Sequence, residues 1–446
     1  MRWHSKIYRN SGTLSSVKDS EEDSRIKSCS NPKDLQIERF VERTSAAMPN
    51  PSTQGPFRRT LTRRTLLQNL AVTTVAAAVP ISKAFAQPQY GGSTGQQRGE
   101  MGRIAGAFRR QFSVPATSIA ISRNGQFVYD EAVGMADHQH LLQAQQNSLF
   151  RIASVTVPIT SVTIFSLIEQ GKLNLTDKVF GPSGILGIKY GKPPYKPYVT
   201  DITVDNLLTH TSGGWPNDNT DPMMHNDGWD QTKLITETIA NIPVTNPPGT
   251  HWAYSNFGYC VLGRVIEQIT GQTYEAYVQA NILAPCGITT MQIAKNKESQ
   301  RAPNEVVYFG QYSEDPYKIN ITRMDSGGGW IASSTQLVHF LNHVAGAPGI
   351  PALLKPATIK MMTTPSAAYP LGDARYARGW MVRNNGAGSW WHNGSLPGST
   401  TIMVRTGTGF CWAALCNTRT QPSNQINTAV DQMMWNMVHA VPSWNA

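Results

Sequence analysis

The chain has 446 residues, 40% of them hydrophobic and 15% charged, so it is long enough to bury a sizeable core in one or two domains. Its formal charge of +10 would suit a nucleic-acid partner if the basic residues lay on the folded part of the chain. However, residues 1–86 hold 14 of the 39 Lys and Arg and only 7 of the 29 Asp and Glu, which leaves 25 basic and 22 acidic groups beyond residue 86. That remainder has no basic stripe with interleaved aromatic residues, so we expect no nucleic-acid partner.

The N-terminal segment is typical of an export signal. Arg63 and Arg64 precede an apolar run over residues 66–79, and Ala84-Phe85-Ala86 forms a small-x-small cleavage site. This order of features predicts a signal peptide, and the paired arginines indicate the twin-arginine route to the periplasm or the extracellular space. The apolar run is shorter than the roughly 20 residues that span a bilayer, so we expect no stable membrane insertion after cleavage.

Composition divides the chain into four segments. Residues 1–47 are polar, mixed in charge and without periodicity, which predicts a disordered extension, or a start that truly lies at Met48. Residues 48–86 form the signal peptide. The Gly-, Ser- and Gln-rich residues 87–99 predict a flexible linker, and residues 100–446 predict a single folded domain.

The folded part begins with a helical pattern over residues 101–112. Two strands, 118–122 and 126–131, follow and are joined by Asn124-Gly125, a strong hairpin signal. Apolar periodicity then predicts a helix over 156–171, and residues from about 155 to 335 alternate helices with loops rich in Pro, Asn and Gly. Strand patterns return at residues 379–383, 389–392, 400–405 and 410–417, before a last helix over 425–439.

Strands at both ends of the chain surround a helical middle. This arrangement predicts an α/β (α+β) fold, in which an antiparallel sheet is built from both chain ends, is flanked by helices and receives an inserted helical domain. No repeat period occurs, and the sequence does not indicate an oligomeric state.

The five cysteines do not form a metal-binding pattern. No CxxC or Cys/His spacing occurs, and His339 and His343 lack a third ligand, so we predict neither a metal nor another cofactor. An odd offset along a predicted strand places Cys411 and Cys416 on opposite faces, where they cannot form a disulfide. Cys260 and Cys286 leave two alternatives, a disulfide or two free thiols in the core, and the second is preferred.

A serine begins the helix predicted over 156–171. The amide of Ser154 is among the unpaired N–H groups of the first turn, where the helix macrodipole stabilises negative charge. Such a place suits an oxyanion. Taken alone, however, a serine here is an ordinary helix N-cap.

Four segments in order give Ser154 a chemical context. They are Phe150-Arg151-Ile152-Ala153-Ser154, residues 207–214 (Leu-Leu-Thr-His-Thr-Ser-Gly-Gly), Tyr254-Ser255-Asn256 with its helix, and His392-Asn393-Gly394-Ser395. In these blocks the chain resembles the serine β-lactamase-related family, which includes class C β-lactamases, penicillin-binding proteins and esterase-like serine hydrolases. The resemblance covers about residues 100–435. It therefore implies a β-lactamase/transpeptidase-like fold and a serine hydrolase domain over residues 100–446.

The resemblance also implies roles for single residues. Ser154 would attack an ester or amide carbonyl of a small-molecule or peptide substrate, Tyr254 would carry its proton to the leaving group, and Asn256 would orient substrate or base. The backbone N–H groups of Ser154 and Ser395 would hold the oxyanion, an effect of roughly 3–4 kcal/mol per donor.

The third block adds residues that line the substrate pocket. His392 stands where many members have lysine, and it would lie beside Gly394. Alternate strand residues face opposite sides, so Trp390 rather than Trp391 would share the face of His392. Core filling is the alternative for both tryptophans.

One position departs from the family pattern. Three residues after Ser154, on the same helical face, the family has a lysine, whereas this chain has Val157. Without that cation, a tyrosine of pKa about 10 is ionised in only about one molecule per thousand at pH 7. Two functions therefore remain open: an exported serine hydrolase with impaired activity, unless His392 or another group replaces the lysine, and a non-catalytic binding or sensing protein. The substrate itself is not indicated.

The export signal makes a direct prediction. Mature protein should begin at or near Gln87, and replacing Arg63 and Arg64 with lysines should leave the precursor inside the cell, because the twin-arginine route reads the arginine pair. N-terminal sequencing and fractionation measure both results. Exported protein that retains residues before Thr62 would contradict the prediction.

Overall fold

The computed structural model describes residues 92–311, 313–383, 388–420 and 422–444. The predicted extension over 1–47, the signal peptide over 48–86 and the candidate start at Met48 lie outside the described residues. Within the described part, no helix combines the length and apolarity that crossing a bilayer requires.

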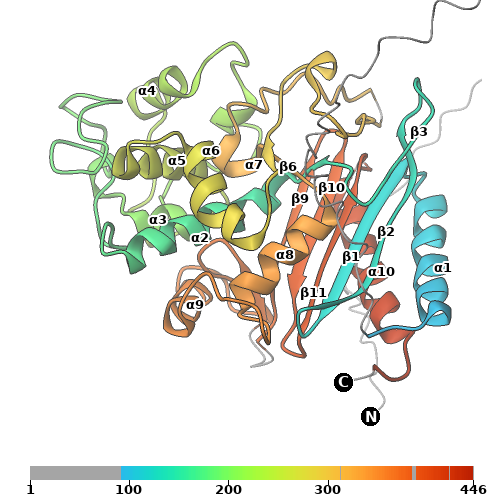
Figure 1. The fold of residues 1–446 in the computed structure, drawn as a ribbon. Helices are drawn as coiled ribbons and strands as arrows, with labels where there is room; N and C mark the ends of the chain where they lie inside the picture. The colour runs from blue at the N-terminus through green and yellow to red at the C-terminus, as the bar shows by residue number, and fades with distance from the viewer. Residues whose placement is uncertain (1–91, 312, 384–387, 421, 445–446) are drawn as a thin grey trace, which may run out of the picture. The chain divides into compact units, whose positions relative to one another are not determined.

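The main sheet has eight strands in the order β3-β2-β1-β11-β10-β9-β8-β7, and every pair in it is antiparallel. The first long strand pairs with the last one, since Ile119 of β1 lies opposite Ala414 of β11 (Figure 1). The predicted sheet made from both chain ends is therefore confirmed. The strands are β1 Ala116–Arg123, β2 Gln126–Asp137, β3 Leu142–Gln143, β7 Ala374–Tyr376, β8 Met381–Arg383, β9 Trp390–Leu396, β10 Ser399–Arg405 and β11 Phe410–Cys416.

The predicted hairpin at the start of the sheet is also confirmed. Asn124 and Gly125 join β1 to β2, and their φ angles are +49° and +83°. Two consecutive positive φ angles are those of a type I′ turn, whose twist matches that of the flanking strands.

Helices cover both faces of the sheet. On one face α1 (Gly95–Gln111) and α10 (Ser423–His439) pack around Trp412, while on the other α8 (Ser334–Ala345) packs against β1 and β11 (Figure 1). Cys411 lies in the core on the α8 side and Cys416 in the core under α10, as their odd offset predicts. These two cysteines, together with Cys260 and Cys286, are free and buried, so the preferred alternative for the latter pair is correct.

Helix α1 begins earlier than the sequence predicted. It starts at Gly95, so residues 95–99 of the predicted flexible linker are helical. The cause is a capping box, in which Gln97 N donates to Thr94 Oγ1 at 3.2 Å and Thr94 N donates to Gln97 Oε1 at 2.7 Å.

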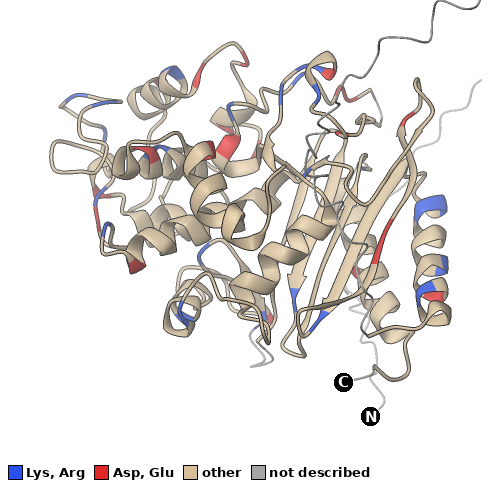
Figure 2. Ribbon diagram, viewed as in Figure 1, with Lys and Arg blue, Asp and Glu red and all other residues tan. Residues whose placement is uncertain are grey.

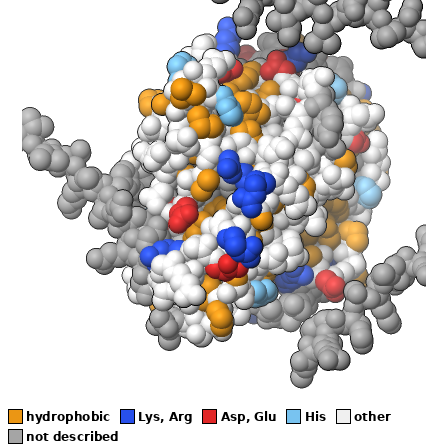
Figure 3. Space-filling view, turned by 90° about the vertical axis from the view of Figure 1, so that its right-hand side faces the viewer, with side chains coloured by type: hydrophobic (Ala, Val, Ile, Leu, Met, Phe, Trp, Pro, Cys, Tyr) orange, Lys and Arg blue, Asp and Glu red, His pale blue; other side chains and the backbone are white. Residues whose placement is uncertain are grey.

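Charged residues are more frequent on α1 than on the strands of the main sheet (Figure 2). The face of the molecule that contains α1 carries a group of basic side chains with acidic ones beside it (Figure 3).

The inserted region is mainly helical, as predicted. A short three-stranded sheet, in the order β4-β6-β5, connects it to the main sheet. Its elements are β4 Phe150–Arg151, α2 Thr156–Glu169, α3 Val204–Leu208, α4 Gln231–Asn241, α5 Asn256–Thr270, α6 Tyr274–Val278, β5 Gln292–Ile293, α7 Asp325–Gly328, β6 Trp330–Ala332 and α9 Pro356–Met362.

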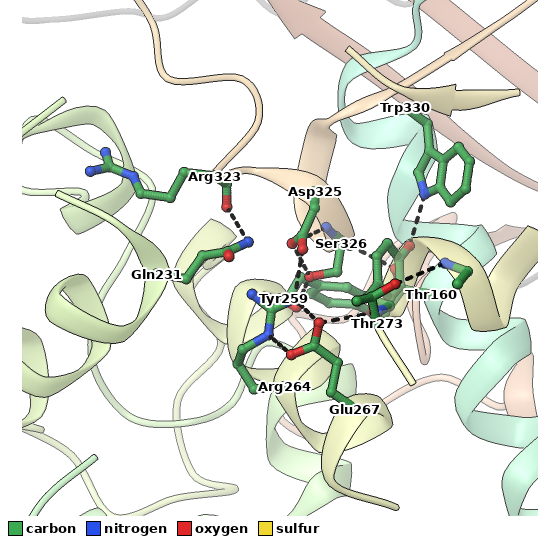
Figure 4. Close-up of polar contacts among 12 residues, drawn as sticks. Thr160, Gln231, Tyr259, Arg264, Glu267, Thr273, Arg323, Asp325, Ser326 and Trp330 are labelled. Atoms are coloured by element: carbon green, nitrogen blue, oxygen red, sulfur yellow. Dashed lines mark hydrogen bonds and ion pairs between the residues drawn. The ribbon is translucent and has the colours of Figure 1, made fainter. Parts of the chain in front are cut away.

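A buried ionic network fixes α5 in place. The guanidinium of Arg264 contacts Asp325 Oδ2 at 2.6 Å and Glu267 Oε2 at 2.8 Å (Figure 4). Thr160 of α2 donates to the carbonyl of Ser326 at 2.7 Å, which ties α7 to α2. Removing one member would leave a buried charge without its partner, which costs roughly 3–5 kcal/mol. Helix α5 is thus tied to α7, and α7 to α2.

Candidate functional site

Ser154 lies on a strained turn. It is the middle residue of a 3₁₀ turn, Ala153–Val155, that leads directly into α2. Ala153 has a φ of +49°, a conformation that costs roughly 1–3 kcal/mol and persists only where the surroundings impose it. Ser154 is partly exposed, whereas Ala153 and Val155 are buried. The turn therefore presents the serine hydroxyl and conceals its neighbours.

Strands β9 and β10 impose this conformation. Thr401 Oγ1 donates to the carbonyl of Ile152 at 2.7 Å, just before the strained residue. A Cβ at Gly394 would lie 2.5 Å from the Ile152 carbonyl oxygen and 2.9 Å from the amide nitrogen of Ser154, so only glycine fits there. The backbone of β9 at Gly394 and Ser395 consequently passes directly against the amide of Ser154, next to where an oxyanion would form.

Tyr254 approaches Ser154 from the other side. It precedes α5, whose N-cap is Ser255 with Oγ accepting from Gly258 N at 3.1 Å. The Tyr254 hydroxyl oxygen is sealed from solvent and makes no hydrogen bond of full geometry with the described residues. Burial raises the pKa of Tyr254 above its usual value, and the nearby Ser154 hydroxyl lowers it in part. The two hydroxyls are thus neighbours.

Asn256 is held from behind by a carboxylate. Its Nδ2 donates to Asp221 Oδ2 at 2.7 Å, and Asp221 Oδ1 accepts from Met223 N at 2.9 Å. Asp221 belongs to the loop over residues 215–229. Burial raises the pKa of this carboxyl group, and the hydrogen bond from Asn256 opposes that shift.

His392 takes part in a chain of hydrogen bonds. Its Nδ1 donates to the carbonyl of Asn393 at 2.7 Å, so its Nε2 must accept from the Tyr376 hydroxyl, 3.2 Å away. Tyr376 in turn accepts from Nε2 of His210 at 2.9 Å, and Nδ1 of His210 accepts from the Ser255 amide at 3.1 Å. The chain fixes the tautomer of both histidines, because each donor requires an acceptor at the next position.

Both histidines of this chain are neutral at pH 7. Burial lowers the pKa of His392 to about 4, and burial together with His392 lowers the pKa of His210 well below its usual value. The two ring nitrogens of His392 are also occupied by hydrogen bonds. This geometry does not favour His392 as the group that replaces the lysine, since its lone pair is directed at Tyr376.

Aromatic rings surround Tyr254. Its ring lies 4.0 Å from that of His210, centroid to centroid, and 6.1 Å from that of His392. Trp252 and Tyr369, both half-buried, contact each other at 4.7 Å. These rings form a wall that limits how Tyr254 can move.

The two tryptophans before His392 separate as strand alternation predicts. Trp390 packs on Trp380 at 4.5 Å in the core that adjoins the site, and Trp391 lies on the α10 side of the sheet. Trp390 is only 4% exposed, so it fills the core beside the site and does not present a surface to substrate. The core-filling alternative therefore describes Trp390.

Val157 is buried in the first turn of α2 and 1% exposed. Sequence reasoning missed three neighbours of the site. His210 lies inside the block over 207–214, where the resemblance gave it no role, and no motif marks Asp221 or Tyr376. Only His210 had a usable signal, its place within that block. Among the described residues no group of three or more His, Cys, Asp or Glu could hold a metal ion.

The chain is similar to several known proteins. It is 25% identical over 294 residues to Protein flp of Staphylococcus aureus (strain MRSA252), a match that covers 65% of this chain and 57% of the relative. It is 27% identical over 280 residues to the putative penicillin-binding protein PbpX of Bacillus subtilis (strain 168), covering 62% and 64%. The chain thus spans less than two thirds of the length of these relatives.

Solved structures share the fold. One is the D-amino acid amidase from Ochrobactrum anthropi SV3 in complex with L-phenylalanine amide, with a TM-score of 0.62, 22% identity and coverage of 78% of this chain and 100% of that one. Another is the β-lactamase/D-alanine carboxypeptidase from Pseudomonas syringae, with a TM-score of 0.63, 16% identity and coverage of 77% and 99%.

The family model for Beta-lactamase matches residues 101–432, which is most of the chain and includes every residue of the site described above. The predicted resemblance and the predicted fold are confirmed together. The chain belongs to the Beta-lactamase family and has a β-lactamase/transpeptidase-like fold.

Proposed function

We propose that the chain is an exported serine hydrolase that cleaves an ester, amide or peptide bond through an acyl-enzyme on Ser154. The observation that carries the proposal is the position of Ser154 between the backbone of β9 and the buried hydroxyl of Tyr254. Such a position supplies a nucleophile, a proton carrier and oxyanion donors at one point.

In the proposed reaction each group has one role. Ser154 Oγ bonds to the substrate carbonyl carbon while its proton passes to the phenolate of Tyr254, and the amides of Ser154 and Ser395 hold the resulting oxyanion. When the bond to the leaving group breaks, Tyr254 returns the proton to that group. Water then attacks the acyl-enzyme in the same manner and releases Ser154.

Val157 favours a second candidate, a non-catalytic binding or sensing protein. No cation stands next to Tyr254 in the first turn of α2, and burial raises the pKa of its phenol. Phenolate is therefore scarce at neutral pH, and acylation should be slow. Two known proteins with this fold nevertheless support hydrolysis, since one is a D-amino acid amidase and the other a β-lactamase/D-alanine carboxypeptidase.

Covalent labelling distinguishes the two candidates. A hydrolase should react with a fluorophosphonate at Ser154, giving a mass increase on the peptide that contains it, because the probe needs only a nucleophile and an oxyanion site. Ser154→Ala should not react. An unlabelled, folded wild type would favour the binding protein. A parallel exposure to a penicillin shows whether β-lactams also acylate the serine.

Restoring the lysine tests the role of Val157. Val157→Lys should speed hydrolysis of an activated nitrophenyl ester at least ~30-fold, about 2 kcal/mol of transition-state stabilisation, because an ammonium near Tyr254 favours the phenolate. Val157→Met, of similar length and without charge, is the matched control and should give no gain. Adding Ser154→Ala to Val157→Lys should abolish the gain. A folded but inert lysine variant would count against the proposed mechanism.

The pH profile tests which group accepts the proton. Because the pKa of Tyr254 lies above its usual value, the phenolate fraction rises tenfold per pH unit through neutral pH, and log kcat/KM should rise between pH 6 and 9 with a slope of about one. His392, with a pKa of about 4, stays neutral there and adds no inflection. The rate measured with Ser154→Ala at each pH is subtracted as the background. A plateau that begins near pH 6.5 would indicate a histidine base instead.

A further inference from the structure

The site contains a buried carboxylate and lacks the positive charge of the family's lysine. Val157 brings no cation, and His210 and His392 are neutral, as shown above. The carboxylate of Asp221 is 0% exposed and lies directly behind Asn256, and both of its oxygens accept hydrogen bonds, as an ionised carboxylate does. It is close enough to Tyr254 to raise that pKa.

Two oxygen atoms beside this charge accept no hydrogen bond of full geometry from the described residues, although the Ser154 hydroxyl lies near the first of them. The Tyr254 oxygen is buried and makes no hydrogen bond of full geometry. Asn256 directs its Nδ2 at Asp221, so the Oδ1 of Asn256 points the other way. This Oδ1 accepts no hydrogen bond from the described residues. A buried oxygen without a partner is costly, so the Tyr254 oxygen in particular suits a donor that arrives from outside, and Asn256 Oδ1 is available to accept from the same group.

Arg323, a buried cation that contacts the loop carrying Asp221, does not neutralise this carboxylate by contact. Arg323 is 3% exposed and makes no ion pair with Asp221. Its two terminal nitrogens donate instead to carbonyl groups of the 215–229 loop, those of Asn226, Trp229, Met223 and His225, at 2.6, 3.1, 2.9 and 2.8 Å. Arg323 thereby fixes the loop that carries Asp221. The three other titratable groups of that loop, Asp218, His225 and Asp227, are exposed.

We propose that the substrate carries a primary ammonium group, which binds to Tyr254 Oη and Asn256 Oδ1 with Asp221 behind them, and so supplies the positive charge that Val157 does not. This inference rests on the proposed hydrolase function and names its substrate class: amides or esters of a compound with a free amino group. The half-buried rings of Trp252 and Tyr254 suit a cation as well, because aromatic faces attract it.

The bound ammonium also activates the proton carrier. Its charge lowers the pKa of Tyr254, whose phenol proton leaves to water. The phenolate then accepts the proton of Ser154 as Oγ bonds to the carbonyl carbon, and returns it to the leaving group as that bond breaks. The ammonium keeps its own protons throughout. With a substrate that lacks the ammonium group, little Tyr254 is present as phenolate and acylation is slow.

Three matched probes test the inference: phenylalanine 4-nitroanilide, its N-acetyl derivative and the desamino 3-phenylpropionyl 4-nitroanilide, with both enantiomers where they exist. At pH 7 the free amine should show kcat/KM at least ~10-fold above either neutral probe. This preference should shrink above the pKa of an α-amino group, about 8, where the charge is lost. Equal rates for all three probes would overturn the inference.

Asp221→Asn is the decisive variant, because asparagine keeps one oxygen that can accept from Met223 N, while it removes the charge and the second oxygen, which accepts from Asn256 Nδ2. It should reduce the free-amine preference at least ~10-fold. Asp218→Asn, three residues earlier and exposed, is the matched control and should leave the preference unchanged. Thermal unfolding checks that each variant folds, and Asp221→Gln serves as the second variant if the first does not.

The outcomes separate this inference from the proposed function. If Ser154 is labelled by a fluorophosphonate but the free amine has no advantage, the hydrolase stands and the ammonium proposal fails. If Ser154 is not labelled and no probe is cleaved, the hydrolase itself fails. A preference that survives Asp221→Asn in full would show that another group recognises the amine, which also overturns the proposal.

Discussion

The close passage of strand β9 across the Ser154 turn is the constraint on which the rest of the site depends. At Gly394 the two backbones are so near that a Cβ would lie 2.5 Å from the Ile152 carbonyl oxygen. This contact, with the hydrogen bond from Thr401, holds Ala153 at a positive φ and aims Ser154 outward. The sheet thus balances the strain of the turn, and the inserted helices, fixed by the Arg264 network, bring Tyr254 to the same point.

The electrostatics of the site follow from one absent cation and one buried anion. A lysine at position 157 would lower the pKa of Tyr254 from within the protein, whereas Asp221 and burial both raise it. In a site of this kind phenolate is scarce until positive charge is delivered to it. A cationic substrate would couple its own recognition to activation of the nucleophile, because binding and phenolate formation would then depend on the same charge. Such coupling gives selectivity that a resident lysine does not provide.

The two histidines illustrate how hydrogen bonding can remove a residue from proton transfer. His392 stands in the third block, and its position alone made it the first candidate for a replacement base. In the fold, His210, Tyr376 and His392 form one directed chain from the Ser255 amide to the Asn393 carbonyl, and every donor and acceptor in it is used. The chain ties the start of α5 to β9 and supports the ring of Tyr254 through His210. Its part is to position rather than to exchange protons.

The sequence by itself determined the fold class, the hairpin at Asn124-Gly125, most strands of the sheet and the set of motif residues around Ser154, because these depend on local propensity, periodicity and order along the chain. It also revealed the missing lysine at Val157. It could not show that β9 runs on through Gly394 to Leu396, since glycine and asparagine disfavour strands and only pairing with β10 overrides them. Nor could it place Asp221 behind Asn256 or Tyr376 between two histidines. Asp221 and Asn256 are 35 residues apart in the chain, and His210 and Tyr376 are 166 residues apart, so only the packing of distant segments decides which partners meet and which charges remain.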